Sequence, residues 1–157
     1  MRDGFTDYVA GRSTSLRATA YLLCGDWHTA EDLTQTAFLK LYKVWDRVRG
    51  YEALDAYARR TLLRVYLDTR RRGRELPAET VPERPVDAEP VAERLAMLAA
   101  LATVPPRQRA VLVLRYWEDL SVEQTAELLG CSEGTVKSQA SRGLEKLRDA
   151  LRTTRRL

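Results

Sequence analysis

The residues best suited to chemistry stand close together near the carboxy terminus. Arg and Gln side chains can each make two hydrogen bonds to guanine or adenine edges in the major groove, while Lys and Ser side chains hold phosphates. The candidate DNA-contacting residues are Glu133, Thr135, Lys137, Ser138, Gln139, Arg142 and Lys146. Their types favour binding to duplex DNA over catalysis. A solvated charged face on an ordinary helical hairpin is the alternative.

Two capped helices joined by a turn are expected to position these residues. Ser121 and Gln124 have the spacing of a capping box, which predicts a helix from Val122. Gly130 can end that helix in the left-handed conformation, and Ser132 can cap the next one. The second helix has an apolar stripe at Val136, Ala140, Gly143 or Leu144, Leu147 and Leu151. Turn, caps and basic face together predict a helix-turn-helix, whose second helix enters the major groove.

Composition is that of a globular chain. It has 157 residues, 45% of them hydrophobic and 31% charged, with a net charge of +4. No apolar run is long enough to span a bilayer, and the amino terminus lacks the layout of a signal peptide. These features predict a cytoplasmic protein without a membrane partner.

Neither a metal site nor a cofactor site is expected. Cys24 and Cys131 lack the paired spacing of zinc ligands, so both are interpreted as packing residues. His28 is the only histidine and has no second ligand nearby in the sequence. Gly-rich phosphate loops and nucleophile motifs are missing from the sequence. No cofactor is therefore predicted, and the chain is not expected to be an enzyme.

The middle of the chain divides it into two parts. Residues 73–91 hold most of the six prolines and carry more acids than bases, which predicts a linker. The flanking segments, 1–72 and 92–157, are basic overall and show no lasting alternation with period two. We therefore expect an all-α fold of two small helical domains joined by a Pro-rich acidic linker, the second ending in the helix-turn-helix.

A helix with two different faces is expected within residues 26–44. Thr29 is a candidate cap, with Glu31 and Asp32 in the first turn to complement the positive helix end. The apolar stripe is Ala30, Leu33, Ala37, Leu41 and Val44. The side chains expected to point elsewhere are Asp32, Gln35, Leu39 and Tyr42. Such a mixture suits a partner interface, although exposed apolar residues are also common on monomers.

A long Arg-rich helix is expected over residues 51–72, ending at Gly73. Its inward residues are Ala58, Leu62, Val65 and Tyr66. Arg60, Arg64 and Arg71 share the opposite face with Asp68, a row that suits a phosphate backbone. Residues 45–51 are expected to form a loop, in which Arg47, Arg49 and Tyr51 either contact unstacked bases or form a solvated turn. Trp45 is interpreted as a core residue.

Four motifs in order carry a family resemblance. They are the Asp-x-x-x-Ala-Glu-Asp-Leu-x-Gln-x-x-Phe pattern at 26–38 with the Arg-rich helix after it, the Pro-rich linker, Val-Pro-Pro-Arg-Gln-Arg-Ala-Val-Leu-Val-Leu-Arg-Tyr at 104–116, and Gly-Thr-Val-Lys-Ser at 134–138. Over nearly its full length the chain resembles a bacterial sigma factor of the extracytoplasmic-function (ECF) type. That is the small class that keeps only regions 2 and 4.

The resemblance implies a promoter-specificity subunit whose partners are core RNA polymerase and promoter DNA, with an anti-sigma factor as a candidate regulator. The helix bearing Asp32, Gln35, Leu39 and Tyr42 would dock on the β′ clamp helices. Residues 47–72, with Arg47, Arg49, Tyr51, Arg60, Arg64 and Arg71, would recognise and melt the minus-ten element with a base flipped out. The helix from Glu133 would read the minus-thirty-five element, and the acidic linker would run near the RNA exit path.

The chain departs from the family pattern at two places. Leu63 and Arg64 stand where Arg-Asn is expected, and Gln139 stands where many relatives have Arg. Gln139 could shift preference from guanine toward adenine. The main alternative function is a stand-alone helix-turn-helix regulator that binds duplex sites without polymerase. An adaptor that uses its helices only for protein contacts is a more remote alternative, against which the basic faces argue.

Overall fold

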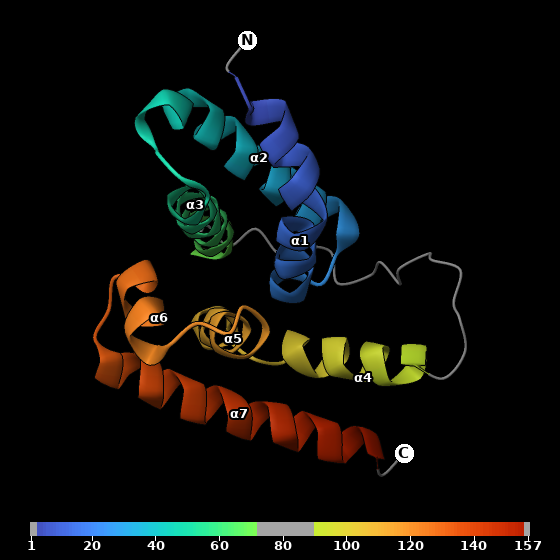
Figure 1. The fold of residues 1–157 in the computed structure, drawn as a ribbon. Helices are drawn as coiled ribbons and strands as arrows, with labels where there is room; N and C mark the ends of the chain where they lie inside the picture. The colour runs from blue at the N-terminus through green and yellow to red at the C-terminus, as the bar shows by residue number, and fades with distance from the viewer. Residues whose placement is uncertain (1–2, 72–89, 156–157) are drawn as a thin grey trace.

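The structure is a computed structural model that describes residues 3–71 and 90–155. The amino-terminal half contains α1 (Phe5–Cys24), α2 (Trp27–Val44), the short 3₁₀-helix η1 (Trp45–Arg47) and α3 (Tyr51–Arg71). The carboxy-terminal half contains α4 (Pro90–Ala102), α5 (Pro106–Leu112), the π-helical segment η2 (Val113–Trp117), α6 (Val122–Leu129) and α7 (Glu133–Arg155). Figure 1 shows α1, α2 and α3 grouped above the other four α-helices, with α7 running along the opposite side.

The described residues form helices and turns without any strand, which confirms the predicted all-α class. Most of the predicted linker, residues 73–91, lies outside the described residues, as does the predicted helix end at Gly73. Helix α4 begins at Pro90, inside that predicted segment. Within the ranges described, none of the helices is both long and apolar enough to traverse a bilayer.

The helix-turn-helix signals are confirmed atom by atom. Ser121 Oγ accepts the Gln124 amide at 3.0 Å, and Gln124 Oε1 accepts the Ser121 amide at 2.9 Å, which completes the capping box. Gly130 ends α6 with φ 67°. Ser132 Oγ accepts the Thr135 amide at 3.1 Å at the start of α7. Local hydrogen bonds therefore fix both ends of the turn.

The start of α2 differs from the sequence prediction. Asp26 is the cap, because its carboxylate accepts the Thr29 amide at 3.0 Å and the Thr29 hydroxyl at 2.7 Å. Thr29 therefore lies inside the helix as a donor, and Glu31 and Asp32 fall beyond the first turn. A carboxylate is at least as good a cap as a hydroxyl, and it also complements the positive helix end. The prediction that Thr29 caps the helix was wrong.

The predicted inward faces of α2 and α3 are largely confirmed. Most members of the α2 stripe are buried, namely Ala30, Leu33, Ala37 and Leu41, as are Ala58, Leu62 and Tyr66 of α3. Val44 and Val65 are half-buried. The prediction of a loop over residues 45–51 was wrong for its first part, because Trp45–Arg47 continues α2 as a 3₁₀ turn and Tyr51 already belongs to α3.

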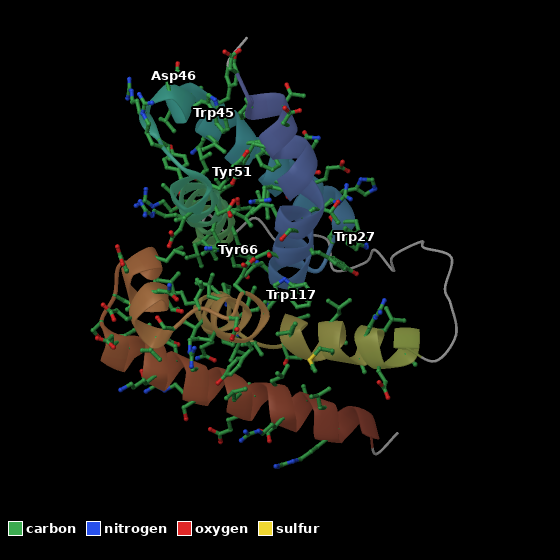
Figure 2. All side chains as sticks on the ribbon, in the orientation of Figure 1. Trp27, Trp45, Asp46, Tyr51, Tyr66 and Trp117 are labelled. Atoms are coloured by element: carbon green, nitrogen blue, oxygen red, sulfur yellow. The ribbon has the colours of Figure 1, made fainter. Side chains whose placement is uncertain are left out.

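The two halves share one apolar core. Ala110, Val113 and Leu114 of the carboxy-terminal half belong to the same buried cluster as Leu62 and Tyr66. Contacts between the halves join α1 to α4, α5 and η2, and α3 to α5 and α6. Figure 2 shows Tyr66 on the side of α3 that faces the lower half. The described helices therefore form one packed body.

Arg109 is a buried cation that joins the ends of two helices. It is only 4% exposed, and burial lowers its pKa. Its guanidinium donates to the carbonyl oxygens of Leu23 at 2.6 Å and Ala102 at 3.0 Å, in the last turns of α1 and α4. Val104 O accepts two further bonds. The last carbonyls of a helix lack intrahelical partners and carry partial negative charge, so they are suitable acceptors for a buried cation.

The capping box makes a measurable contribution to stability. Ser121→Ala removes the side-chain acceptor for the Gln124 amide, and we expect the free energy of unfolding to fall by about 1 kcal/mol. Urea unfolding followed by circular dichroism measures this loss. Ser141→Ala, at an exposed position within α7, is the matched control and should leave stability nearly unchanged. Equal stability of both variants and the wild type would contradict the capping assignment.

Candidate nucleic-acid and polymerase interfaces

The start of α7 presents an exposed polar surface. Glu133, Lys137, Ser138, Arg142 and Lys146 are exposed, and Thr135 is half-exposed. The opposite side is anchored by Val136, which is fully buried against Val111 and Ala126. Gly143 allows α7 to approach α5 closely, because an added Cβ would lie 3.1 Å from Leu112 Cδ1. These contacts hold one face of α7 inward and leave the predicted DNA face free.

Two of the predicted DNA-contacting side chains already make hydrogen bonds within the protein, and a third is partly buried. The Thr135 hydroxyl lies 2.9 Å from Ser132 Oγ, and the Ser138 hydroxyl donates to Thr135 O at 3.1 Å. Gln139 is half-buried, and its Oε1 is buried without a hydrogen-bond partner among the described residues. To contact adenine with both the oxygen and the nitrogen of its side-chain amide, Gln139 must change rotamer. Arg142 and Lys146 are exposed and need no such change.

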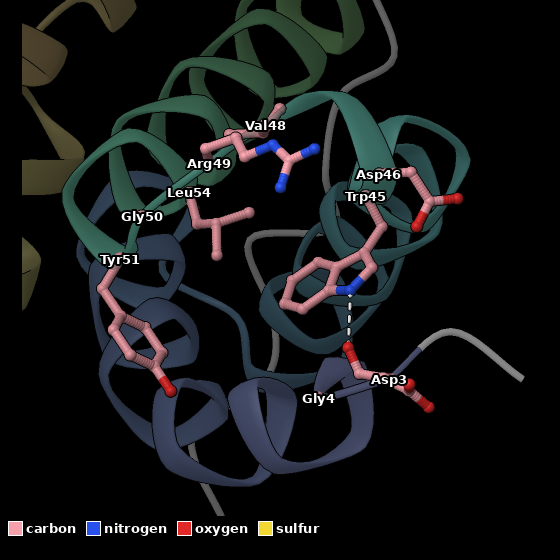
Figure 3. Close-up of a pocket in the computed structure, with 9 residues that line it drawn as sticks. All are labelled: Asp3, Gly4, Trp45, Asp46, Val48, Arg49, Gly50, Tyr51 and Leu54. Atoms are coloured by element: carbon pink, nitrogen blue, oxygen red, sulfur yellow. Dashed lines mark hydrogen bonds between the residues drawn. The ribbon is translucent and has the colours of Figure 1, made fainter.

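A hollow of about 460 Å³ lies where η1 leads into α3. Its walls come from the start of α1 and from residues 45–54, and they comprise Asp3, Gly4, Trp45, Asp46, Val48, Arg49, Gly50, Tyr51 and Leu54. Figure 3 shows the Trp45, Arg49, Leu54 and Tyr51 side chains around it. Gly50 has φ 88°, a left-handed conformation that brings the chain round into α3. Arg49 and Tyr51 are therefore placed on one concavity.

Aromatic packing fixes the wall of this hollow. The Trp45 ring meets Phe5 edge-on at a centroid distance of 5.3 Å, and its indole N–H donates to Asp3 O at 2.8 Å (Figure 3). Tyr51 stacks parallel to Tyr8 at 6.1 Å yet remains 65% exposed. Trp45 is half-buried rather than fully in the core. Its orientation is thus set by the protein, while the Tyr51 ring keeps a face open to solvent.

A hydrogen-bonded network of Tyr8, Arg12 and Asp55 packs against Tyr51. Tyr8 Oη donates to Asp55 Oδ1 at 2.5 Å, and Arg12 Nε donates to the same oxygen at 2.9 Å. Burial and the bond to Asp55 raise the pKa of Tyr8. The Arg12 guanidinium also lies 5.6 Å from the centre of the Tyr51 ring. Tyr8 and Arg12 belong to α1 and Asp55 belongs to α3, so side chains from two helices hold Tyr51 in place at the edge of the hollow.

The remaining predicted minus-ten residues do not all lie at this hollow. Arg47 is exposed on η1 but is not part of its wall. Arg60 and Arg64, further along α3, line a second hollow of about 280 Å³ together with Glu127 and Leu128 of α6. The Arg71 side chain lies outside the description. The structure thus groups Arg49 with Tyr51, and Arg60 with Arg64, at two separate hollows, the second of which is shared with α6.

The outer face of α2 combines polar and apolar side chains. Asp32 and Gln35 are exposed, Leu39 is 65% exposed, and Tyr42 is 37% exposed. Spacings of three and four residues place these side chains on one helix face. The Tyr42 ring packs edge-on against Phe5 at 4.9 Å, which restricts its position. The predicted separation of this face from the buried stripe is confirmed.

Three residues with a role in joining the halves were missed by sequence reasoning. Thr19 Oγ1 donates to Glu118 Oε1 at 2.5 Å, and Arg59 Nε lies 3.2 Å from Glu118 Oε2. The Arg59 and Glu118 side chains are only 23% and 15% exposed, so the pair is shielded from water. The spacing of apolar residues in a sequence indicates which face of a helix is buried. It does not identify which residue of the other half pairs with a given charged side chain.

The cysteines and the histidine have no metal partners in the part of the chain described here. No group of three or more His, Cys, Asp or Glu side chains is arranged to hold a metal ion there. Both cysteines are free thiols, Cys24 buried and Cys131 half-buried. His28 is exposed. Burial raises the pKa of the Cys24 thiol to about 11, which keeps it protonated and unreactive near neutral pH.

A helix-turn-helix on an all-α scaffold is typical of DNA-binding proteins, and comparisons with known proteins make the class specific. Residues 12–75 match the family described as Sigma-70 region 2, and residues 94–147 match Sigma-70, region 4. The chain is 39% identical to the RNA polymerase sigma-E factor of Streptomyces coelicolor, over 94% of this chain and 85% of the relative.

Further relatives carry the ECF description in their names. The ECF RNA polymerase sigma factor SigE of Mycolicibacterium smegmatis is 36% identical over 84% of this chain and 55% of its own length. Among solved structures, the fold resembles the sigma factor RpoE of Bartonella quintana, in complex with the anti-sigma factor NepR, with TM-score 0.71 and 24% identity. That match covers 96% of this chain and 98% of the solved chain.

The chain belongs to the sigma-70 family, as a sigma factor of the ECF type. It directs transcription initiation, with core RNA polymerase and promoter DNA as its partners. Matches to both sigma regions favour this function over the stand-alone regulator.

The two thiols are expected to differ in reactivity. At pH 8, iodoacetamide should modify Cys131 of the native protein and spare Cys24, because Cys24 is buried and its pKa is about 11. Mass spectrometry of tryptic peptides measures the two sites separately, and labelling in urea is the control in which both should react. Rapid modification of Cys24 in the native protein would show that the carboxy-terminal end of α1 is more accessible to solvent than it is in the structure.

Proposed function

We propose that three separate surfaces of this sigma factor divide the work of initiation: the outer face of α2 binds polymerase, the hollow before α3 takes the minus-ten element, and the start of α7 reads the minus-thirty-five element. The observation that carries the proposal is that all three surfaces are exposed while the faces behind them are buried in one core. Residues 1–72 and 92–157 are proposed as the working domains. In this scheme the chain is a binding subunit rather than an enzyme.

The α2 face fits docking on the β′ clamp helices. A coiled coil offers a ridge with apolar and charged positions, and α2 offers Leu39 and Tyr42 beside Asp32 and Gln35. Exposed Leu39 gains most from burial, since a fully buried Leu side chain contributes about 1.5–3 kcal/mol. Asp32 and Gln35 then provide directional hydrogen bonds that fix the register of the contact.

The hollow before α3 fits an unstacked base of the minus-ten element. Melting removes a base from the stack at a cost of a few kcal/mol. An aromatic ring returns about 1–3 kcal/mol per stacked base, and the open face of Tyr51 is available for this. Arg49 on the same wall provides charge for the adjoining phosphate. Arg47, Arg60 and Arg64 would hold further phosphates, which contribute affinity without sequence preference.

The start of α7 fits the major groove of the minus-thirty-five element. Arg142 is exposed and long enough for a bidentate contact to guanine, while Lys137 and Ser138 sit beside it for phosphates. Thr135 is held at the helix start by Ser132. Gln139 would read adenine only after leaving its half-buried rotamer.

An anti-sigma factor is proposed as a further partner. Two solved structures with the same fold are complexes: the sigma factor RpoE with the anti-sigma factor NepR, and CnrH with the cytosolic domain of CnrY. Exposed apolar side chains on this chain, including Leu39, Leu95 and Trp117, offer sites for a partner helix. Co-purification with core polymerase, followed by run-off transcription from a library of host genome fragments, tests the whole proposal. Tight binding to duplex DNA by the protein alone, without association with polymerase, would contradict it.

The α2 face can be tested by a single substitution. Asp32→Ala should weaken binding to core polymerase by about tenfold or more, because it removes a directional, charge-assisted contact from the proposed interface. Fluorescence anisotropy of labelled protein titrated with core polymerase measures the change. Glu31→Ala removes a neighbouring exposed carboxylate outside the predicted face and serves as the control. Equal losses for the two variants would argue for a general charge effect instead.

The recognition surface of α7 predicts a base-specific loss. Arg142→Ala should weaken promoter binding of the holoenzyme by about 1–3 kcal/mol if Arg142 makes a bidentate base contact, and it should relax specificity at one base pair. Binding to promoter variants mutated at each minus-thirty-five position measures both effects. Arg148→Ala, exposed further along the same helix, is the control. A uniform loss across all promoter variants would assign Arg142 to a phosphate.

A further inference from the structure

Tyr8 of α1 lies behind the wall of the hollow before α3 and contacts both aromatic rings of that wall. Its ring lies at an angle of 13° to that of Tyr51 with a centroid distance of 6.1 Å, and at 59° to that of Trp45 with a centroid distance of 5.6 Å. Tyr8 is only 3% exposed and does not itself line the hollow. The influence of Tyr8 on a molecule in the hollow therefore passes through those two rings.

The Tyr8 ring is restrained because its hydroxyl is bound. Tyr8 Oη donates to Asp55 Oδ1, and Arg12 Nε donates to the same carboxylate oxygen. Hydrogen bonds to an ionised carboxylate are charge-assisted and stronger than those between neutral groups. Asp55 lies four residues after Tyr51 on α3, about one helical turn away. The bond to Asp55 thus fixes the Tyr8 ring relative to the helix that carries Tyr51.

Arg12 adds a second restraint on the Tyr51 ring. Its guanidinium carbon lies 5.5 Å from the centre of the Tyr8 ring and 5.6 Å from the centre of the Tyr51 ring. A cation within about 6 Å of a ring centre is attracted by the electron-rich face of the ring. Because Asp55 also binds this guanidinium, its place between α1 and α3 is fixed. Arg12 therefore draws the two stacked tyrosine rings to one point.

Tyr51 is restrained and yet largely open to solvent. It is 65% exposed, although it stacks on Tyr8 and lies beside Arg12. Figure 3 shows its side chain leaving the start of α3 and pointing toward α1, at the edge of the hollow. A ring that is already oriented loses little conformational freedom when a base stacks on it, whereas an unrestrained side chain loses that freedom on binding.

From these contacts we propose that Tyr8 and Arg12 are positioning residues for promoter melting: they hold the Tyr51 ring in the orientation in which an unstacked base of the minus-ten element stacks on it. The proposal rests on the function assigned to this hollow above. Neither Tyr8 nor Arg12 touches DNA in this scheme, since both act through Tyr51. The stack comprises Tyr8, Tyr51 and the base in succession, with Arg12 beside the two tyrosine rings.

Removal of either restraint should slow melting without weakening the binding of duplex DNA. We expect Arg12→Ala and Tyr8→Leu each to lower the rate of promoter opening by the holoenzyme about threefold to tenfold, because the Tyr51 ring must then be immobilised at the moment of stacking. Permanganate oxidation of unpaired thymines in the minus-ten element, followed over time, measures opening. Binding of the holoenzyme to the same promoter at a temperature too low for melting should stay unchanged.

A double-mutant cycle separates positioning of Tyr51 from simple bracing of the fold. If Arg12 acts through Tyr51, Arg12→Ala should have no further effect on opening once Tyr51→Ala has removed the ring. Bracing of α1 against α3 would instead give the same loss in both backgrounds. Arg17→Ala is the matched control, because Arg17 lies on the same helix and pairs with Glu31 of α2 at 4.0 Å, outside the wall of the hollow. It should open the promoter at the wild-type rate.

The free protein offers a readout that needs no polymerase. In carbon–proton NMR spectra of protein with isotope-labelled tyrosine rings, the Tyr51 signal is identified by its loss in Tyr51→Phe. Stacking on Tyr8 should displace this signal from the position of an unstacked tyrosine, and Arg12→Ala should move it back toward that position. Thermal unfolding followed by circular dichroism checks that each variant is folded.

The outcomes distinguish a failure of the positioning role from a failure of the proposed function. Opening at the wild-type rate by Tyr51→Ala would contradict the function assigned to the hollow, while the NMR signal still tests whether the ring is held. Slow opening by Tyr51→Ala, together with wild-type rates for Arg12→Ala and Tyr8→Leu, would overturn the positioning role. Equal losses from Arg12→Ala with and without the Tyr51 ring would overturn it as well.

Discussion

The arrangement of this sigma factor depends on how a single buried cation is neutralised. The acceptors of the Arg109 guanidinium are backbone carbonyl oxygens, namely those of Leu23 and Ala102 in the last turns of α1 and α4, and that of Val104. Helix ends collect unpaired carbonyls with partial negative charge, so two helix termini can act together as a counter-ion. The requirement to satisfy Arg109 thus fixes the place where α1 of one half meets α4 and α5 of the other.

Around this point, the contacts fall into two groups with different consequences. Apolar packing of Leu62 and Tyr66 with Val113 and Leu114 gives the halves cohesion. The polar contacts of Glu118 give the interface its register, because this one carboxylate contacts Thr19 of α1 and Arg59 of α3. An interface of this mixed kind holds the described helices of the two halves in one packed body.

Local features of the sequence predicted the structure best where a short-range hydrogen bond determines it. Ser121 with Gln124, Gly130 and Ser132 all behave as expected, because caps depend on residues three or four positions apart. The start of α2 was misjudged because Asp26 and Thr29 are both good caps, and only the structure shows which one accepts. The half-buried state of Gln139 and the pairing of Arg59 with Glu118 were beyond prediction, since each depends on a tertiary neighbour.

The central claim is that the two halves of the free protein pack into one body, held together by a shared apolar core and by Arg109. The most direct measurement is the distance between spin labels on native Cys131 and on an introduced Thr14→Cys, an exposed α1 position, with buried Cys24 unlabelled. Pulsed electron resonance should give one short and narrowly distributed distance for the free protein, as a single packed body requires. A broad distribution that extends to distances longer by tens of ångströms would contradict the account.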